Sequence, residues 1–93
     1  MREGAYVIGR GPALAGRRSA IRLDDPTVSE RHAELVVLNG SLHLTDLGSR
    51  NGTWRVDDSG EERLSEADVE PHDVLRFGRM QMRVSDLLAR AGI

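Results

Sequence analysis

Three short polar clusters in this chain carry side chains that bind anionic oxygen atoms. They are Gly9-Arg10, Ser29-Glu30-Arg31-His32 and Asp46-Leu47-Gly48-Ser49-Arg50-Asn51-Gly52-Thr53. The guanidinium of Arg10 and the hydroxyl of Ser29 donate hydrogen bonds to such atoms. Arg31 and Arg50 add positive charge, and the Asn51 amide both donates and accepts, which suits the main chain of an extended peptide. Brought together, these groups have the chemistry to bind an anionic group such as a phosphate, which carries about −1.5 to −2 charges as a monoester.

Each of these residues also has an ordinary structural interpretation when it is judged alone. An isolated Arg10 is most often a surface residue, and Ser29 is often a turn or cap residue. The pair Asn51-Gly52 alone indicates a hairpin turn. His32 opens a predicted strand, so we interpret it as structural. What favours a binding function is therefore the complete set in this order.

Asp46, Ser29 and His32 also raise the alternative of a hydrolase triad. A serine three positions before a histidine at the start of a strand does not form a nucleophile elbow, and no oxyanion hole is apparent. We therefore expect Asp46 to brace a tight loop, and we predict no enzymatic activity. The histidines at 32, 43 and 72 lack metal-site spacing, so no metal or other cofactor is expected.

The composition fits one small globular domain. The 93 residues are 39% hydrophobic, which is enough to bury one modest core. No cysteine is present, which excludes disulfides and thiolate chemistry. The net charge of −2 does not indicate nucleic-acid binding, and neither a signal peptide nor a membrane span is visible. We therefore expect a cytoplasmic domain over residues 1–93.

Alternating apolar residues predict a chain made mostly of short β-strands. The predicted strands lie at residues 5–8, 20–23, 33–37, 42–44, 54–56 and 75–84, the last as a hairpin around Gly78-Arg79. Residues 57–73 carry eight acids and are predicted to form a solvated loop with a short strand near Arg63-Leu64. Ser85 or Asp86 is expected to cap a C-terminal helix or tail over residues 85–93. This pattern favours an all-β sandwich of two antiparallel sheets.

The turn signal Asn39-Gly40 places two of the polar clusters side by side. It predicts a hairpin, and the far ends of the two antiparallel strands in a hairpin are neighbours. Ser29 precedes one of these far ends and Asn51 follows the other, so both residues should lie at one edge. Arg10 is not placed by this argument, because a simple hairpin of the first two predicted strands would put it at the opposite end.

The three clusters resemble the signature of the forkhead-associated (FHA) domain from about residue 5 to 56, with weaker similarity to about residue 84. That family is a phosphothreonine-reading β-sandwich. The resemblance implies a non-catalytic module that binds phosphothreonine-containing proteins in Ser/Thr kinase signalling. It implies that Arg10, Ser29 and Arg50 bind the phosphate and that Asn51 binds the peptide main chain. The further roles it implies are ligand contact, for Glu30 and Arg31, and structural support, for Gly9, His32, Gly52 and Thr53.

The chain also departs from the usual FHA pattern. Only residues 1–4 precede the strand that ends at Gly9-Arg10, where the family has a strand pair. A sandwich that lacks this N-terminal strand pair exposes sheet edges, and exposed edges favour pairing. The alternatives are a truncated chain, a homodimer or strand swap, and coverage of the gap by residues 85–93. The functional alternative is a phosphate-independent or self-associating interaction module on the same fold.

Overall fold

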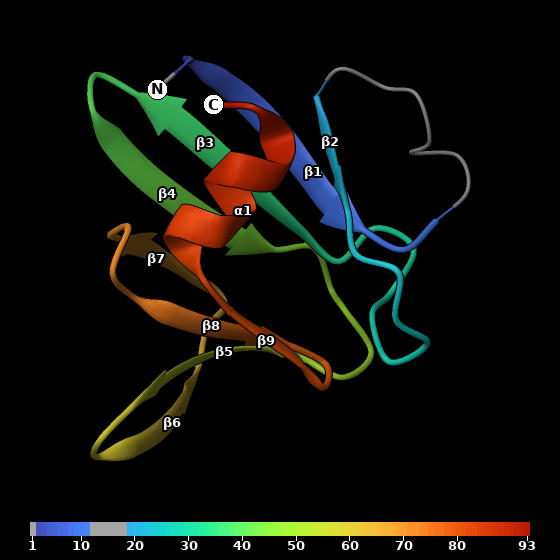
Figure 1. Cartoon of the computed structure of the whole chain (residues 1–93). Coiled ribbons are helices and arrows are strands. Elements are labelled where there is room, and N and C mark those ends of the chain that lie inside the picture. The colour runs from blue at the N-terminus through green and yellow to red at the C-terminus, as the bar shows by residue number, and fades with distance from the viewer. Residues whose placement is uncertain (1, 12–18) are drawn as a thin grey trace.

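The protein consists of two β-sheets and one helix, as seen in a computed structural model that describes residues 2–11 and 19–93 (Figure 1). One sheet has the strand order β2-β1-β3-β4-β7, with β1 (Gly4–Gly9), β2 (Ala20–Arg22), β3 (Ala33–Leu38), β4 (Ser41–Asp46) and β7 (Glu66–Val69). The other has the order β6-β5-β8-β9, with β5 (Thr53–Asp57), β6 (Gly60–Arg63), β8 (Val74–Phe77) and β9 (Met80–Arg83). Helix α1 (Val84–Ala91) follows β9. The predicted all-β sandwich is thereby confirmed.

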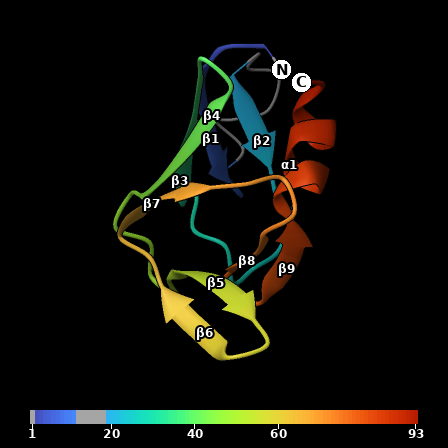
Figure 2. The ribbon, with the colours of Figure 1, turned by 90° about the vertical axis from the view of Figure 1, so that its left-hand side faces the viewer.

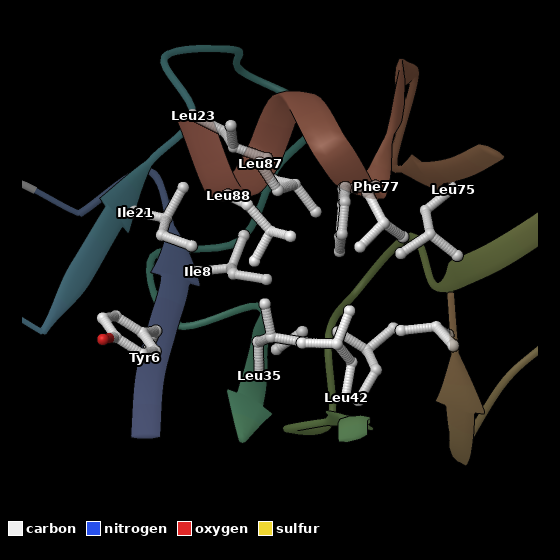
Figure 3. Packing of buried hydrophobic residues seen from close by; sticks show 14 of the residues in the cluster. Tyr6, Ile8, Ile21, Leu23, Leu35, Leu42, Leu75, Phe77, Leu87 and Leu88 are labelled. Carbon is white, nitrogen blue, oxygen red and sulfur yellow. The ribbon is translucent and has the colours of Figure 1, made fainter. Parts of the chain in front are cut away.

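The inner faces of the two sheets meet in one hydrophobic core (Figure 3). Alternate residues of a strand point to opposite faces of its sheet. Ile8, Leu35 and Leu44 accordingly point inward from the first sheet and are completely buried, as are Leu75 and Phe77 of the second. The alternation predicted for these strands is confirmed, and the packed core holds the strand ends from which the functional loops start.

Strands β3 and β4 form the hairpin that Asn39-Gly40 predicts. Both turn residues have positive φ angles, 52° at Asn39 and 77° at Gly40, as a two-residue hairpin turn of this kind requires. At the far end of the hairpin Ala33 pairs with Asp46. The loop that enters β3 and the loop that leaves β4 therefore begin next to each other.

Strands β1 and β2 pair in parallel, which corrects the simple hairpin considered for them. Gly9 at the end of β1 is opposite Arg22 at the end of β2. On its other side β1 is antiparallel to β3, with Ile8 opposite Ala33. The five-stranded sheet is therefore mixed rather than wholly antiparallel. This pairing brings the end of β1, and with it Arg10, to the edge where β3 begins.

The acidic segment of residues 57–73 contains two strands where mostly loop was predicted. Strand β6 pairs with β5, and β7 pairs with β4. All four residues of β6 are exposed, so hydrophobic alternation gave no signal for this strand. Cross-strand pairs support it instead, such as Arg55 and Glu62, whose side chains lie 3.4 Å apart. The strand predicted near Arg63-Leu64 corresponds to β6, which begins at Gly60 and ends at Arg63.

Helix α1 packs beside β2 and β9 and covers one side of the core (Figure 2). Val84, Leu87 and Leu88 are its buried residues, so Val84 belongs to the helix and not to the preceding strand. Residues 85–93 thus lie against the core, as one of the three alternatives proposed. Within the described residues, no helix has the length and apolar character needed to cross a membrane.

The start of α1 differs from the predicted cap. Arg83 occupies the N-cap position without a side-chain hydrogen bond, so neither Ser85 nor Asp86 caps the helix. Instead the Ser85 N–H donates to the Pro71 carbonyl at 2.9 Å. The unpaired N–H groups of a helix start need acceptors, and here a neighbouring loop supplies one.

Candidate functional site

Three connecting segments meet at one end of the sandwich, and we call this end the rim: residues 9–11, 23–32 and 46–52. The first two segments run side by side, because the Arg10 N–H donates to the Ser29 carbonyl at 3.0 Å. The second and third are joined by side-chain hydrogen bonds described below. All three polar clusters singled out in the sequence therefore lie at the rim.

The side chain of Arg10 is held against the loop that carries Ser29. Its Nε–H donates to the Val28 carbonyl at 2.8 Å, and the residue is half-buried. Val28 itself is anchored in the core at 1% exposure. The hydrogen bond to the carbonyl of this buried residue therefore fixes the Arg10 guanidinium at its Nε atom. The other N–H groups of the guanidinium are not used in this bond.

Ser29 connects the second segment of the rim to the third. Its hydroxyl oxygen accepts a hydrogen bond from the Arg50 N–H at 3.0 Å. A hydroxyl that accepts in this way still has its own hydrogen to donate. Arg50 is exposed, and its backbone lies beside this hydroxyl.

His32 is completely buried beneath the rim and links its loops from below. Its Nδ1 accepts from the Ser29 N–H at 3.0 Å, so the ring proton is on Nε2, which donates to the Gly52 carbonyl at 2.9 Å. The ring also meets Phe77 edge to face, with centroids 5.6 Å apart. Burial lowers the pKa of His32 below its usual value, against the opposing effects of the Gly52 carbonyl and the Asp46 carboxylate.

The carboxylate of Asp46 organises the third segment. Oδ1 accepts from the N–H groups of Gly48 and Ser49, both at 2.8 Å. Oδ2 accepts from the hydroxyls of Ser49 at 2.6 Å and Thr53 at 2.7 Å. Partial burial raises the pKa of Asp46, but these four hydrogen bonds outweigh it and hold the pKa below its usual value. Both oxygens are engaged in shaping the loop, which agrees with the bracing role expected for Asp46 rather than with a triad.

Asn51 spans the gap between the second and third segments. Its Nδ2 donates to the Thr27 carbonyl at 2.8 Å, and its own carbonyl accepts from the Trp54 indole N–H at 3.1 Å. Asn51 is exposed, and within the described residues its side-chain oxygen makes no hydrogen bond. One N–H and the oxygen of the amide thus have no hydrogen-bond partner among the described residues.

The remaining predicted site residues divide into supporting and surface positions. Gly9, Gly52 and Thr53 are buried. Glu30 and Arg31 are exposed in the turn before β3, and neither side chain makes a hydrogen bond or ion pair within the described residues. These two residues follow Ser29 at the surface, and only the backbone carbonyl of Glu30 helps to join the rim segments, because it accepts from the Gly11 N–H at 3.2 Å.

Sequence reasoning missed two residues that help to build this end of the molecule. Thr27 accepts from Asn51 through its carbonyl, and its hydroxyl accepts from the Arg79 N–H at 2.8 Å. The Gly78-Arg79 pair was identified only as a hairpin turn. Arg79 is 52 residues from Thr27 in the chain, and no local pattern relates the two.

Neither the surface cavity beside the rim nor the placement of metal-ligating residues indicates a site for a small molecule or a metal ion among the described residues. A hollow of about 480 Å³ adjoins the rim and is lined by Asp46, Gly48, Arg63, Leu64 and Ser65. Within residues 2–11 and 19–93, no group of three His, Cys, Asp or Glu residues is arranged to hold a metal ion. The donors of the rim are side chains on surface loops, which suits a peptide better than an enclosed small molecule.

The sandwich and its rim define a class of protein-interaction module. The family model of the FHA domain matches residues 6–78 of the chain. The chain therefore belongs to the FHA domain family. FHA domains recognise phosphothreonine in other proteins, and a similar solved structure comes from a structural and functional analysis of phosphothreonine-dependent FHA domain interactions. That structure has 32% sequence identity and a TM-score of 0.71, over 89% of this chain and 77% of its own.

Two of the proteins to which the chain is similar are named as an inhibitor and a regulator. The oxoglutarate dehydrogenase inhibitor of Corynebacterium diphtheriae is 42% identical over 79 residues, which is 83% of this chain and 52% of that protein. The glycogen accumulation regulator GarA of Mycobacterium tuberculosis is 33% identical over 79 residues, again 83% of this chain and 46% of that protein. The chain thus spans about half the length of these two relatives.

Proposed function

We propose that this protein is a non-catalytic module that binds a phosphothreonine-containing segment of a partner protein at the rim. The observation that carries the proposal is the hydrogen bond from the Arg50 N–H to the Ser29 hydroxyl oxygen. Because the hydroxyl oxygen accepts this bond, its hydrogen stays available for donation to an anion. The Arg10 guanidinium is tied to Val28, the residue next to Ser29, so a cationic fork and a hydroxyl donor stand together.

In this proposal the phosphate is bound by Arg10, Ser29 and Arg50. Each charge-assisted hydrogen bond contributes about 1.5–3 kcal/mol, so the phosphate should dominate the affinity. Asn51 binds the main chain of the peptide through the amide groups that Thr27 does not use. This division separates recognition of the phosphate from recognition of the peptide.

The two residues that follow Ser29 tune which peptides are accepted. Glu30 is an exposed acid and favours a basic side chain in the ligand, whereas Arg31 favours an acidic one. Exposed pairs of this kind are worth about 0.2–1 kcal/mol. They would therefore adjust affinity among phosphopeptides but would not replace the phosphate.

The test is a fluorescence-polarisation titration with peptides that differ only in the phosphate on threonine. The plain threonine peptide should bind at least about tenfold more weakly, which corresponds to 1.4 kcal/mol. Binding should also weaken below about pH 6, where the phosphate loses its second charge. Ser29→Ala should reduce the affinity, while Ser41→Ala, on an exposed part of β4, should not. Equal binding of both peptides would favour the phosphate-independent alternative.

The proposal extends to the setting in which the module works. A Ser/Thr kinase must create the ligand, so we assign the protein to the cytoplasm, where such kinases find their substrates. Residues 1–93 would act as one domain. A homodimer or strand swap is proposed only as a second state, because α1 already packs Leu87 and Leu88 against the core.

A further inference from the structure

The β8–β9 turn, residues 78–79, reaches the rim beside Asn51. The Arg79 N–H donates to the Thr27 hydroxyl at 2.8 Å, while the Thr27 carbonyl accepts from Asn51. The Gly78 N–H donates to the Gly52 carbonyl at 3.1 Å. Two residues of the turn are therefore bonded to two different loops of the rim.

The position of this turn is tightly constrained. Gly78 has a φ angle of +60°, and a Cβ atom built on it would lie 2.3 Å from the Thr27 carbonyl oxygen. No side chain fits at that distance, so only glycine permits the close approach. The Gly78 carbonyl also accepts from the Arg76 guanidinium. The turn is consequently a fixed part of the rim and not a freely moving hairpin tip.

Arg79 presents its charge at this fixed position. The residue is exposed, and its side chain makes no hydrogen bond or ion pair within the described residues. Its charge is near the Asp25 carboxylate, whose pKa is lowered mainly by hydrogen bonds from the hydroxyl and N–H of Thr27 and to a smaller extent by Arg79. Oδ1 of Asp25 accepts both hydrogen bonds from Thr27, so this carboxylate is hydrogen-bonded within its own loop and not to the Arg79 side chain.

We infer that Arg79 is a specificity-determining residue that selects an acidic side chain in the bound phosphopeptide. This inference rests on the proposed function. Thr27, to which Arg79 is bonded, is two residues from Ser29, a span of at most about 7 Å along the chain. A peptide that places its phosphate at Ser29 and its main chain at Asn51 would bring a residue about two to four positions away to Arg79.

The structure allows the side chain to be changed without disturbing the turn. The hydrogen bond to Thr27 uses the backbone N–H of Arg79, which every substitution except proline retains. Arg79→Ala, Arg79→Lys and Arg79→Glu should therefore melt at nearly the wild-type temperature. Arg90→Ala, an exposed arginine in the last turn of α1, serves as the matched control.

The experiment uses alanine-flanked phosphothreonine peptides that carry a single Asp, Asn or Lys at each of four positions on either side. The wild-type protein and Arg90→Ala should prefer Asp over Asn by about two- to fivefold at one of these positions. Arg79→Lys should keep this preference, Arg79→Ala should lose it, and Arg79→Glu should favour Lys there. Each affinity is divided by the affinity of the same variant for the peptide with alanine flanks alone, so that a general change in phosphopeptide binding cancels. The preference should shrink in 1 M salt, where exposed charges are screened.

The outcomes separate this inference from the function on which it rests. An Asp preference that survives in Arg79→Ala, or the absence of any such preference in the wild-type protein, would overturn the role of Arg79 while leaving phosphothreonine binding intact. If the wild-type protein bound no phosphothreonine peptide at all, the proposed function itself would be refuted, and the role of Arg79 with it.

Discussion

The Nε2–H of buried His32 donates to the Gly52 carbonyl at 2.9 Å, across 20 residues of chain. The same carbonyl accepts from the Gly78 N–H, so one oxygen joins the loop before β3, the loop before β5 and the β8–β9 turn. His32 therefore supports the rim from within the core, while the residues proposed to bind the ligand lie above it.

Replacing His32 should lower stability more than it alters the proposed contacts. His32→Ala leaves the Ser29 N–H and the Gly52 carbonyl without their partner, at a cost of about 1–3 kcal/mol. For a domain of this size, each kcal/mol corresponds to about 4–8 °C in melting temperature. Thermal melts of His32→Ala beside His72→Ala, which changes an exposed histidine, check the prediction. A His32→Ala protein with unchanged melting but no peptide binding would make His32 a ligand contact.

The acid sensitivity of the fold should depend on His32 and Asp46. Because the folded state lowers the pKa of His32, the unfolded chain binds its proton more readily, and stability should fall as the pH drops through about 6.5. Asp46 also has a lowered pKa, so its contribution is present above about pH 3.9 and disappears as the pH falls through the folded-state value.

Asp46→Asn tests the second of these contributions. The variant should lose about 1–3 kcal/mol at neutral pH, because the amide cannot accept all four hydrogen bonds that the carboxylate accepts. Denaturant unfolding between pH 2.5 and 7 should show the difference from wild type shrinking at low pH. Asp58→Asn in the exposed β5–β6 turn is the control. A difference that stayed constant across the pH range would contradict the assigned role of the Asp46 charge.

Arg10→Ala should affect both binding and folding. A wholly solvent-facing arginine would cost less than about 0.5 kcal/mol on removal. The hydrogen bond from Arg10 Nε to the Val28 carbonyl raises the expected loss to about 1 kcal/mol, and phosphopeptide binding should be abolished. Paired melts and peptide titrations measure the two effects separately. Normal phosphopeptide binding by this variant would refute the assigned phosphate site.

Trp54 should report ligand binding directly. It is the only tryptophan in the chain, and its indole N–H donates to the Asn51 carbonyl at 3.1 Å. A peptide that bonds to the Asn51 amide should alter this environment, so tryptophan emission should change in proportion to phosphopeptide bound. Equilibrium titrations with the unphosphorylated peptide give the baseline for the emission change. An emission spectrum that stays constant at saturation would place the peptide away from Asn51.

Self-association should be controlled by α1. Leu87→Ala removes a fully buried side chain at a cost of about 2–5 kcal/mol and loosens the helix from the core. Sedimentation velocity should show a monomer for the wild-type protein and concentration-dependent dimers for this variant. A wild-type protein that dimerised as readily as Leu87→Ala would mean that α1 does not protect the exposed strands.

The sequence by itself determined most of the strands and the residue types at the rim. Alternation such as Leu35 with Val37 reports which face of a strand is buried, and Asn39-Gly40 specifies a tight turn, because both signals depend only on near neighbours. The same hairpin was enough to place Ser29 and Asn51 at one edge. Here local chain geometry and residue type together decide the outcome.

Local sequence patterns placed neither Arg10 nor Arg79: the family resemblance implied the place of Arg10 beside Ser29, and only the tertiary structure gives the reason for it and the position of Arg79. Arg10 reaches the rim because β1 runs antiparallel to β3, which puts the end of β1 beside the start of β3, and no local pattern encodes this pairing. The exposed strand β6 and the uncapped start of α1 likewise depend on partners distant in the chain. Arg79 meets Thr27 only after both sheets have packed, because a hydrogen bond across 52 residues requires the whole core to set the positions of its two ends.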